Sequence, residues 1–520
     1  MIFNRQFSTE TLINLAHFKL YKVGSLAENQ IRLQYSGVII FAAKIVSVLT
    51  GLAFQLMIAR GTTRLEYDVW FNINDILGYF TLLAGALPFW TMRFAARGKE
   101  AALKTGILAN LAISVIAVAI YLPLVPIITS SLGVSAGYVL LYFLVFIEII
   151  EQYSIRAMEA FLRARTPQSI GYGLLVAEVC KVTLGYTLII GFQKPLLGAL
   201  LSLMMGFAIQ MAYYFKLVSG ELKHNIRWEY VKEWVKGSLA NIYHIVGQRI
   251  AAFVFILLFA YGAEGARGSY GAAAQIANVI AYSMFLAYAL YPKLLAEKNA
   301  EDITTALKMV SLFAIPMTAG IIALSNSYII IMKYEFRDAW SVLVVLAADY
   351  FLLTVSQFFS SVLFGVESVD EEAKISFRDL VKSRLFILFS LPYLHSLITL
   401  PTAFYILANY VQDQPIQAAL CVSVVNSLAR LTTFVILFYI VRKMISINIP
   451  WRNLAKYGFA SVIMAAILLL IPHPTRLSST LGLTAVGGIV YLAVLMAIDS
   501  ETRSLVTSIF RKVKSRFGRH

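Results

Sequence analysis

Residues 72–87 of the chain read NINDILGYFTLLAGAL, and residues 275–290, which lie 203 positions later, read QIANVIAYSMFLAYAL. The two stretches align without a gap and share six identities, among them Tyr79 with Tyr282. Asp75 aligns with Asn278, and this polar match matters most because an apolar bias alone produces chance identities. Self-similarity at a fixed offset predicts a chain built from two halves of similar fold.

Each copy of the repeat lies in one of a series of apolar runs that are long enough to cross a membrane as helices. We predict fourteen spans, at 37–59, 69–91, 105–128, 137–156, 170–192, 195–215, 239–262, 269–291, 306–332, 339–364, 385–410, 415–441, 457–471 and 480–498. The repeat unit holds six spans, an even number, so both halves cross the membrane in the same direction. The expected fold is an all-α polytopic membrane protein with about 14 transmembrane helices, arranged as two six-helix lobes plus two C-terminal helices.

The composition agrees with this class. Of 520 residues, 59% are apolar and 14% are charged, whereas a soluble domain carries about 25% charged residues. The net charge of +16 would suggest nucleic acid as a partner of a soluble chain, but basic residues of membrane proteins gather in cytosolic loops, so we expect no nucleic-acid partner. The two cysteines, Cys180 and Cys421, lie inside apolar runs, which excludes a disulfide framework and a cysteine-based metal site.

The distribution of Lys and Arg gives the orientation. With a cytosolic N-terminus, 33 of the 44 basic residues fall on the inner side and seven in outer loops. We therefore predict a multi-pass protein of the cell (inner or plasma) membrane with both termini in the cytosol. The predicted domains are a cytosolic N-terminal segment at 1–36, an N-lobe at 37–218, a cytosolic linker at 219–238, a C-lobe at 239–444, two further helices at 445–500 and a basic, lipid-facing tail at 501–520.

Polar residues inside the predicted spans are candidates for the lining of a cleft between the lobes. A cation in mid-span needs a water-filled cavity or a fixed counter-charge, which singles out Lys44, Arg249 and Arg430. Polar residues at helical spacing add further candidates for substrate contact, namely Gln248, Asn72, Asp75, Gln275 and Asn278. For neutral side chains such as Asn and Ser, hydrogen bonds between helices, worth about 0.6 kcal/mol each, are the favoured explanation.

Carboxylates within the spans are candidates for coupling transport to an ion, either H⁺ or Na⁺. Glu148 and Glu151 lie three residues apart, where two carboxylates repel and favour a proton or cation site, although pairing with Arg156 is the alternative. Asp349 is a third candidate. Glu178 and Lys181 are also three residues apart and are expected to neutralise each other.

Several short motifs give the chain a resemblance to a known family. They are Ala-Arg-Gly at 59–61, Glu-Tyr-Asp-Val-Trp at 66–70, Arg-Phe-Ala-Ala-Arg-Gly-Lys at 93–99, Gly-Gln-Arg at 247–249, Gly-Ser-Tyr-Gly-Ala-Ala at 268–273 and the proline at 292. With these motifs the chain resembles the polysaccharide-export flippases of the Wzx type, in the multidrug/oligosaccharidyl-lipid/polysaccharide (MOP) superfamily. Gln248 departs from the pattern, because the family has Asp there. The resemblance implies a V-shaped pair of six-helix bundles, similar to MATE transporters, that moves a lipid-linked oligosaccharide from the inner to the outer leaflet by alternating access.

The expected cargo is therefore a polyprenyl (pyro)phosphate-linked oligosaccharide used in polysaccharide or glycan biosynthesis, with membrane lipids as surroundings. Lys44, Arg249 and Arg430 would hold its phosphate. We expect no enzyme activity and no cofactor, and the ATP-binding motif G-x-x-x-x-G-K-[ST] does not occur in the sequence. A MATE-type cation/drug antiporter is one alternative. A membrane-embedded glycosyltransferase that binds a metal through Glu66 and Asp68 is another, although these residues could instead cap a turn.

Overall fold

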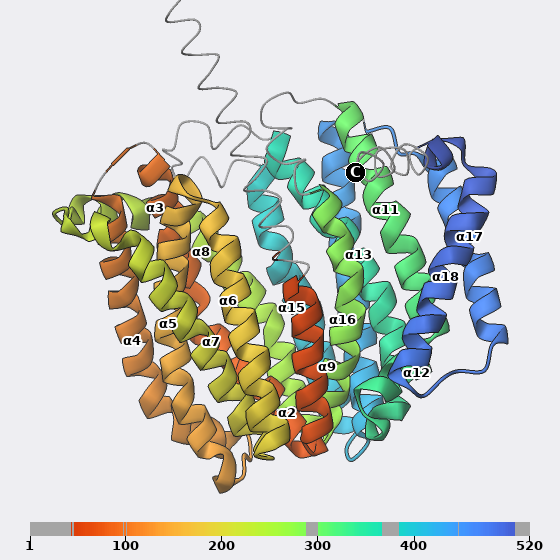
Figure 1. Ribbon diagram of the computed structural model, residues 1–520, viewed down its shortest axis with the longest axis horizontal. Coiled ribbons are helices and arrows are strands. Elements are labelled where there is room, and N and C mark those ends of the chain that lie inside the picture. The colour runs from red at the N-terminus through yellow and green to blue at the C-terminus, as the bar shows by residue number, and fades with distance from the viewer. Residues whose placement is uncertain are drawn as a thin grey trace, which may run out of the picture.

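The computed structural model describes residues 43, 46–96, 98–99, 101–287, 300–366, 384–445 and 447–504 of the chain. Throughout these residues the secondary structure is helical, with no strand (Figure 1). Within the same ranges, eleven helices are long and apolar enough to cross a membrane. The expected all-α membrane fold is confirmed.

The helices follow the predicted spans closely. The first half contains the helix Val46–Gly61, α2 (Arg64–Phe80), η1 (Leu82–Gly85), α3 (Ala86–Ala96), α4 (Ala102–Ser131), α5 (Ala136–Arg165), α6 (Gln168–Gly185), η2 (Tyr186–Gly191), α7 (Pro195–Val218) and η3 (Ser219–Lys223). The second half contains α8 (Trp228–Tyr261), α9 (Ala266–Ala277), η4 (Asn278–Ala287), α11 (Ala300–Ala323), α12 (Ser325–Met332), η5 (Tyr334–Ala339), α13 (Trp340–Val366), α15 (Arg384–Asn409) and α16 (Pro415–Met444). The last two helices are α17 (Trp451–Leu470) and α18 (Leu477–Ile498).

The second predicted span, 69–91, is interrupted between α2 and α3. Pro88 has no N–H with which to continue the hydrogen-bond ladder, so the carbonyl of Ala84 lacks its usual helical donor. The side-chain amide of Asn110 on α4 donates to that carbonyl at 3.2 Å, and the hydroxyl of Tyr153 on α5 donates to the carbonyl of Phe80 at 3.1 Å. Neighbouring helices thus satisfy the irregular backbone, as a membrane interior requires.

Other predicted spans also differ from a single α-helix within the described residues. The span 170–192 ends in the π-helical segment η2, and the span 306–332 is divided at Leu324 between α11 and α12. The span 37–59 starts outside the described ranges, and its described part from residue 46 on forms the helix Val46–Gly61. The span 269–291 begins as α9 and continues as the 3₁₀ segment η4, while its last residues lie outside the described ranges.

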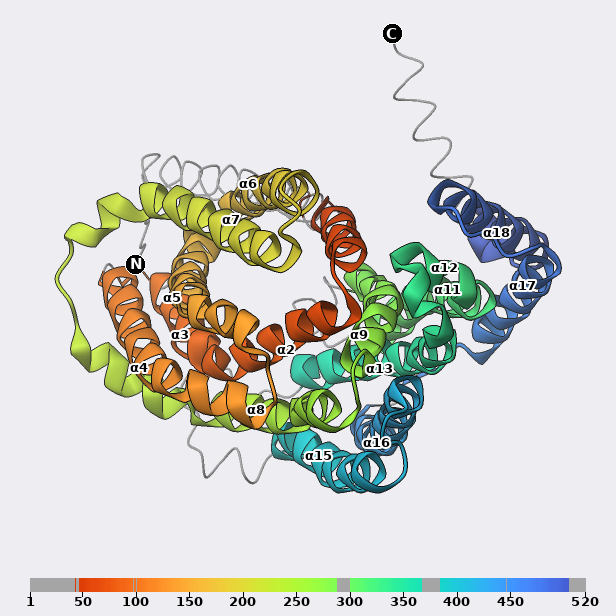
Figure 2. The same ribbon diagram turned by 90° about the horizontal axis from the view of Figure 1, so that it is seen from below.

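Seen along the helices, α2 to α7 surround one region of the molecule and α9 to α16 form a second group beside it (Figure 2). The long helix α8 runs between them and packs against α15. The pair α17 and α18 packs on the far side of the second group, where the hydroxyl of Tyr491 donates to the carbonyl of Leu312 on α11. Two helix groups and a C-terminal pair are the predicted architecture.

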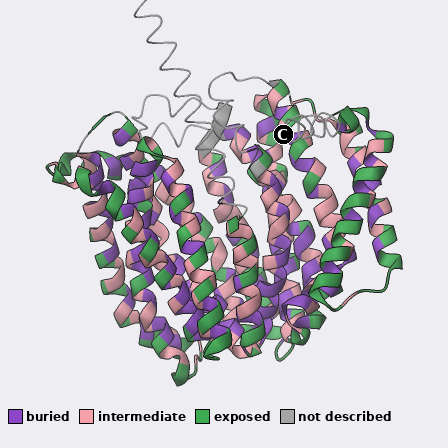
Figure 3. Ribbon diagram, in the orientation of Figure 1, coloured by how far each residue is buried: buried purple, intermediate pink, exposed green. Residues whose placement is uncertain are grey.

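Many residues on the outward faces of the peripheral helices are exposed (Figure 3), and large apolar side chains are among them. On α4, only 17% of the most apolar 18-residue stretch is buried. Val115, Ile116 and Ile120 are each more than half exposed. A water-soluble monomer rarely exposes so large an apolar patch, so this face is suited to contact lipid.

Candidate functional site

A cavity of about 430 Å³ lies among the helix Val46–Gly61, α2, α5, α6, α7, α8 and the α9–η4 segment. Both copies of the sequence repeat contribute to its wall, through Asn74 and Gly78 from the first copy and Gln275 and Tyr282 from the second. The wall combines amide, hydroxyl and charged groups with aromatic rings. Such a mixture can bind a ligand that carries both charge and many hydrogen-bonding groups.

Arg249 on α8 brings a positive charge to the cavity wall. Its guanidinium lies directly against Gly78, so close that a Cβ atom built on this glycine would be 2.5 Å from Nη1. The hydroxyl of Tyr79 donates to the Arg249 carbonyl at 3.1 Å and joins α8 to α2. Arg249 forms no ion pair with any described residue, which leaves its charge available to an anion.

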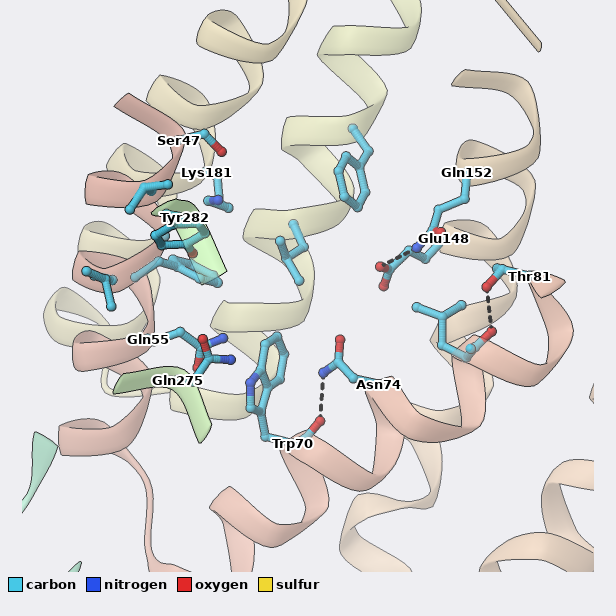
Figure 4. Close-up of a pocket in the computed structure, with 18 of the residues that line it drawn as sticks. Ser47, Gln55, Trp70, Asn74, Thr81, Glu148, Gln152, Lys181, Gln275 and Tyr282 are labelled. Carbon is cyan, nitrogen blue, oxygen red and sulfur yellow. Dashed lines mark hydrogen bonds between the residues drawn. The ribbon is translucent and has the colours of Figure 1, made fainter. Parts of the chain in front are cut away.

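A second cation, Lys181 on α6, also lines the cavity, and it is paired. Its ammonium lies 2.5 Å from the carboxylate of Glu178, as the spacing of the two residues predicts. Ser47 and Thr50 of the first helix donate to the same carboxylate at 2.9 and 2.6 Å. The negative charge of Glu178 is therefore balanced by Lys181 and by hydrogen bonds from two hydroxyls. Figure 4 shows Lys181 on the wall opposite Glu148.

The predicted carboxylate pair lies on α5, and one of its members reaches the cavity. Glu148 is buried, lines the cavity and accepts a hydrogen bond from the amide of Gln152 at 3.3 Å (Figure 4). Glu151 is buried as well, and its Oε2 atom has no hydrogen-bond partner within the described ranges. Neither carboxylate forms an ion pair with Arg156 or another described residue.

Two of the predicted polar residues lie away from the cavity lining. Asn72 is fully buried, and its side-chain carbonyl accepts from the hydroxyl of Tyr142 on α5 at 2.6 Å. Gln248 is exposed and lies 3.0 Å from the ring of His244 on the same helix. The Asn72 contact joins α2 to α5, and the Gln248 contact stays within α8, so both are structural hydrogen bonds.

Of the two predicted residues in the second repeat copy, one lines the cavity and the other does not. Gln275 lines the cavity, whereas the amide of Asn278 donates to the hydroxyl of Tyr282, which does line it. Lys44 lies outside the described residues.

Asp75 forms an ion pair that joins the two halves. Both of its carboxylate oxygens accept from Arg267 of α9, at 2.7 and 2.9 Å. The guanidinium of Arg267 is buried and also stacks on the rings of Phe71 and Phe255, with its Cζ atom 4.7 and 4.8 Å from the ring centroids. A bidentate, desolvated pair of this kind fixes α2 against α9.

The remaining two candidates, Asp349 and Arg430, form a pair with each other. The Nε atom of Arg430 lies 2.7 Å from Oδ1 of Asp349, whose side chain is 1% exposed. Asn426 on α16 lies beside this pair, 3.5 Å from Asp349, and is itself bonded to His395 of α15. This network is built from α13, α15 and α16, away from the residues that line the cavity.

The two halves also meet at the side that the charge distribution predicts to be outer. Three basic side chains donate to main-chain carbonyls of the other half, namely Arg60 to Ile331, Lys333 to Thr62 and Arg64 to Glu335. These contacts, together with the Asp75–Arg267 pair, close this side of the interface. We call them the outer seal.

The acidic turn at the start of α2 contributes to the same closure. Thr63 and Glu66 form a reciprocal capping box at the N-terminus of α2. The carboxylate of Asp68 accepts from the main-chain N–H groups of Gly265 and Gly268 at the start of α9. Both carboxylates are thus engaged in helix capping, as the structural alternative for this motif predicts.

Several residues of the site are not among the candidates that the sequence suggests. Arg267 falls between the predicted spans 239–262 and 269–291, in an outer loop, but the repeat offset of 203 aligns it with Arg64, and both residues take part in the outer seal. Asn74 and Gly78 line the cavity from within the first repeat copy, and Trp70 lines it from just before that copy.

Comparison with known proteins identifies the fold. No family model and no curated protein sequence matches the chain. A structure described as lipid II flippase MurJ in an inward closed conformation is similar to it, with a TM-score of 0.67 and 15% identity over 90% of this chain and 100% of that one. An inward-facing MATE family transporter of the MOP superfamily is similar with a TM-score of 0.59 and 14% identity, over 78% of this chain and 98% of that one. An outward-facing MATE family transporter gives a TM-score of 0.52 at 15% identity, over 79% and 95%. The chain therefore has the fold shared by these MOP transporters.

Proposed function

We propose that this chain is a membrane transporter that flips a lipid-linked oligosaccharide from the inner to the outer leaflet for polysaccharide or glycan biosynthesis. The observation that carries the proposal is the charge of Arg249 in the cavity, without an ion-pair partner among the described residues. A cation kept inside a membrane protein needs an anionic partner or water. A substrate phosphate or pyrophosphate supplies the missing charge when it binds.

The rest of the cavity suits the sugar part of such a molecule. Gln55, Asn74 and Gln275 present amides that can donate to and accept from sugar hydroxyls. Trp70 offers an aromatic face beside them (Figure 4). Lys44, which lies outside the described residues, is a further candidate for the phosphate.

Transport would proceed by alternating access between the two halves. The outer seal holds the halves together on one side, and it must open for cargo to leave there. The predicted domain boundaries, the cell-membrane location and the cytosolic termini form part of this proposal.

Glu148 and Glu151 are the candidates for coupling to H⁺. A buried carboxylate without a nearby cation is costly in its charged form, so these two are suited to bind a proton or a cation such as Na⁺. Asp349 stays a weaker candidate because Arg430 already neutralises it. If the proposal holds, Glu148→Gln and Glu151→Gln each remove the pH dependence of transport, and unchanged pH profiles in both would refute it.

One observation favours a second candidate, a MATE-type antiporter of cations or drugs. The aromatic rings of Phe54, Trp70 and Phe207, together with Glu148, could bind an organic cation. Arg249 opposes such a ligand by charge repulsion. Loss of resistance to cationic dyes on deletion of the gene would favour the antiporter. The glycosyltransferase has less support, because Glu66 and Asp68 are both engaged in capping.

The test is translocation in proteoliposomes that contain the purified protein and a fluorescent polyprenyl diphosphate-linked oligosaccharide. The wild type should expose the lipid on the far leaflet, and Arg249→Gln should abolish this movement. Arg476→Gln is the control, because it removes an exposed cation from the loop between α17 and α18, far along the chain from the cavity.

A further inference from the structure

A second cavity, of about 210 Å³, lies where α3, α5 and α8 pack together. Its wall is formed by residues of the η1–α3 segment, α5 and α8, namely Gly85, Pro88, Phe89, Met92, Arg156, Glu159, Ala160, Arg163 and Asn241. None of these residues lines the first cavity. By the predicted orientation, this second cavity lies at the cytosolic end of α5, and we call it the inner cavity.

One face of α5 contributes residues to both cavities. Polar residues follow each other along it at steps of four, four, three and four, as Glu148, Gln152, Arg156, Glu159 and Arg163. This spacing keeps them on one side of the helix. Glu148 and Gln152 line the first cavity, and the other three line the inner cavity. A polar path therefore runs along α5 from the cytosolic end to the central site.

The two arginines of the inner cavity are free of ion pairs within the described residues. Glu159 is three residues from Arg156 and four from Arg163, so it could pair with either. Instead, its Oε1 atom accepts from the side chains of Gln210 and Tyr214 on α7, at 3.3 and 3.1 Å. The two arginines are seven residues apart, so their backbone positions are separated by about 10 Å along the helix axis, and both side chains line the cavity.

The position of Arg156 is not explained by the general excess of basic residues in cytosolic loops. It lies nine residues before the end of α5 at Arg165, which corresponds to about 14 Å of helix. A further cation lies beside the same cavity, because Arg93 stacks on the ring of Phe89 with its Cζ atom 4.5 Å from the centroid. Asn241 adds a donor from the opposite wall.

We propose that the inner cavity binds the phosphate or diphosphate group of the substrate lipid at the cytosolic face, before this group moves along α5 to Arg249. Arg156 and Arg163 would each donate charge-assisted hydrogen bonds to the phosphate oxygens. The proposal rests on the function proposed above and adds to it a first binding step with its own residues.

The experiment measures binding and transport separately, with the protein in nanodiscs or vesicles of neutral lipid. Binding is measured with radiolabelled farnesyl diphosphate, and competition with inorganic pyrophosphate and with phosphatidylglycerol identifies the source of the anion. The double variant Arg156→Gln/Arg163→Gln should bind farnesyl diphosphate at least tenfold more weakly and raise the KM of transport by a similar factor, with kcat preserved. The matched variant Arg156→Lys/Arg163→Lys keeps both charges and should retain most of the binding.

The outcomes separate this proposal from the proposed function. If Arg249→Gln stops transport while the Gln double variant keeps wild-type binding and KM, the inner cavity plays no part and this proposal is wrong. If the protein moves no lipid-linked oligosaccharide at all, loss of farnesyl diphosphate binding in the Gln double variant still supports an anion site. Equal competition by inorganic pyrophosphate would assign the site to a soluble anion and overturn its role for the lipid, as would competition by phosphatidylglycerol alone.

Discussion

Replacement of Gly78 by alanine tests whether the position of the Arg249 guanidinium matters for transport. The added Cβ would lie 2.5 Å from Nη1, 3.1 Å from Cζ and 3.6 Å from Nη2 of Arg249. Since ordinary contacts between such atoms are about 3.5 Å, the guanidinium must move by about 1 Å. The group is the end of a flexible side chain, so the fold should tolerate this shift.

The expected effect on transport follows from the hydrogen bonds that the displaced guanidinium can no longer make to its ligand. A charge-assisted hydrogen bond contributes about 1.5–3 kcal/mol, which corresponds to about a tenfold to a hundredfold loss in affinity. The assay is translocation of the lipid-linked oligosaccharide in proteoliposomes, with the KM and the rate measured separately.

Gly51→Ala is the matched control for this substitution. Gly51 also lines the cavity, but a Cβ atom built on it meets nothing within 4 Å. Both variants should insert and unfold like the wild type, and only Gly78→Ala should transport poorly. Equal transport by the two variants would refute the assignment of Arg249 to the binding site.

Five further substitutions test three other parts of the structure. Asp75→Asn and Arg267→Gln each break the buried pair of the outer seal, which should cost about 3–5 kcal/mol in the closed form. Each should also raise the labelling of a cysteine introduced at Asn74 in the cavity by a membrane-impermeant reagent added from the outer side; unchanged labelling would contradict the seal. Asn110→Ala removes the donor of the Ala84 carbonyl at the break in the second span, together with a hydrogen bond to the Tyr153 carbonyl on α5. The free energy of unfolding should therefore fall by about 1–3 kcal/mol, and an unchanged value would show that the break needs no support. Asp349→Asn and Arg430→Gln should both lower thermal stability, and the double variant should lose less than the sum of the two; additive losses would mean that the pair contributes nothing as a pair.

Much of the fold could be predicted from the sequence. The number of spans follows from the length of the apolar runs and the orientation from the Lys and Arg residues in the loops, and both can be read without knowing how the helices pack. The spans around α4, α5 and α7 needed no tertiary information. The interruption of the second span has a local cause in Pro88, but the donors that make it tolerable come from α4 and α5. Those donors depend on which helices are neighbours.

The site was predictable only in part, for the same reason. Helical spacing places residues on one face of a helix, but it does not determine whether that face lies against the cavity, another helix or lipid. Arg249 and Glu148 line the cavity, whereas Arg430 pairs with Asp349 and is not among the lining residues. The Asp75–Arg267 pair joins residues from different halves, and no local sequence pattern in either half predicts it.

In the proposed function, Arg249 in the cavity binds the phosphate of a lipid-linked oligosaccharide during transport. The most direct measurement compares wild type, Arg249→Lys and Arg249→Gln for translocation of a polyprenyl diphosphate-linked oligosaccharide across vesicles of neutral lipid. The account predicts rapid movement with the wild type, partial movement with Arg249→Lys, which keeps the charge but loses the bidentate geometry, and none with Arg249→Gln. Movement by Arg249→Gln at the wild-type rate, at equal protein content, would contradict it.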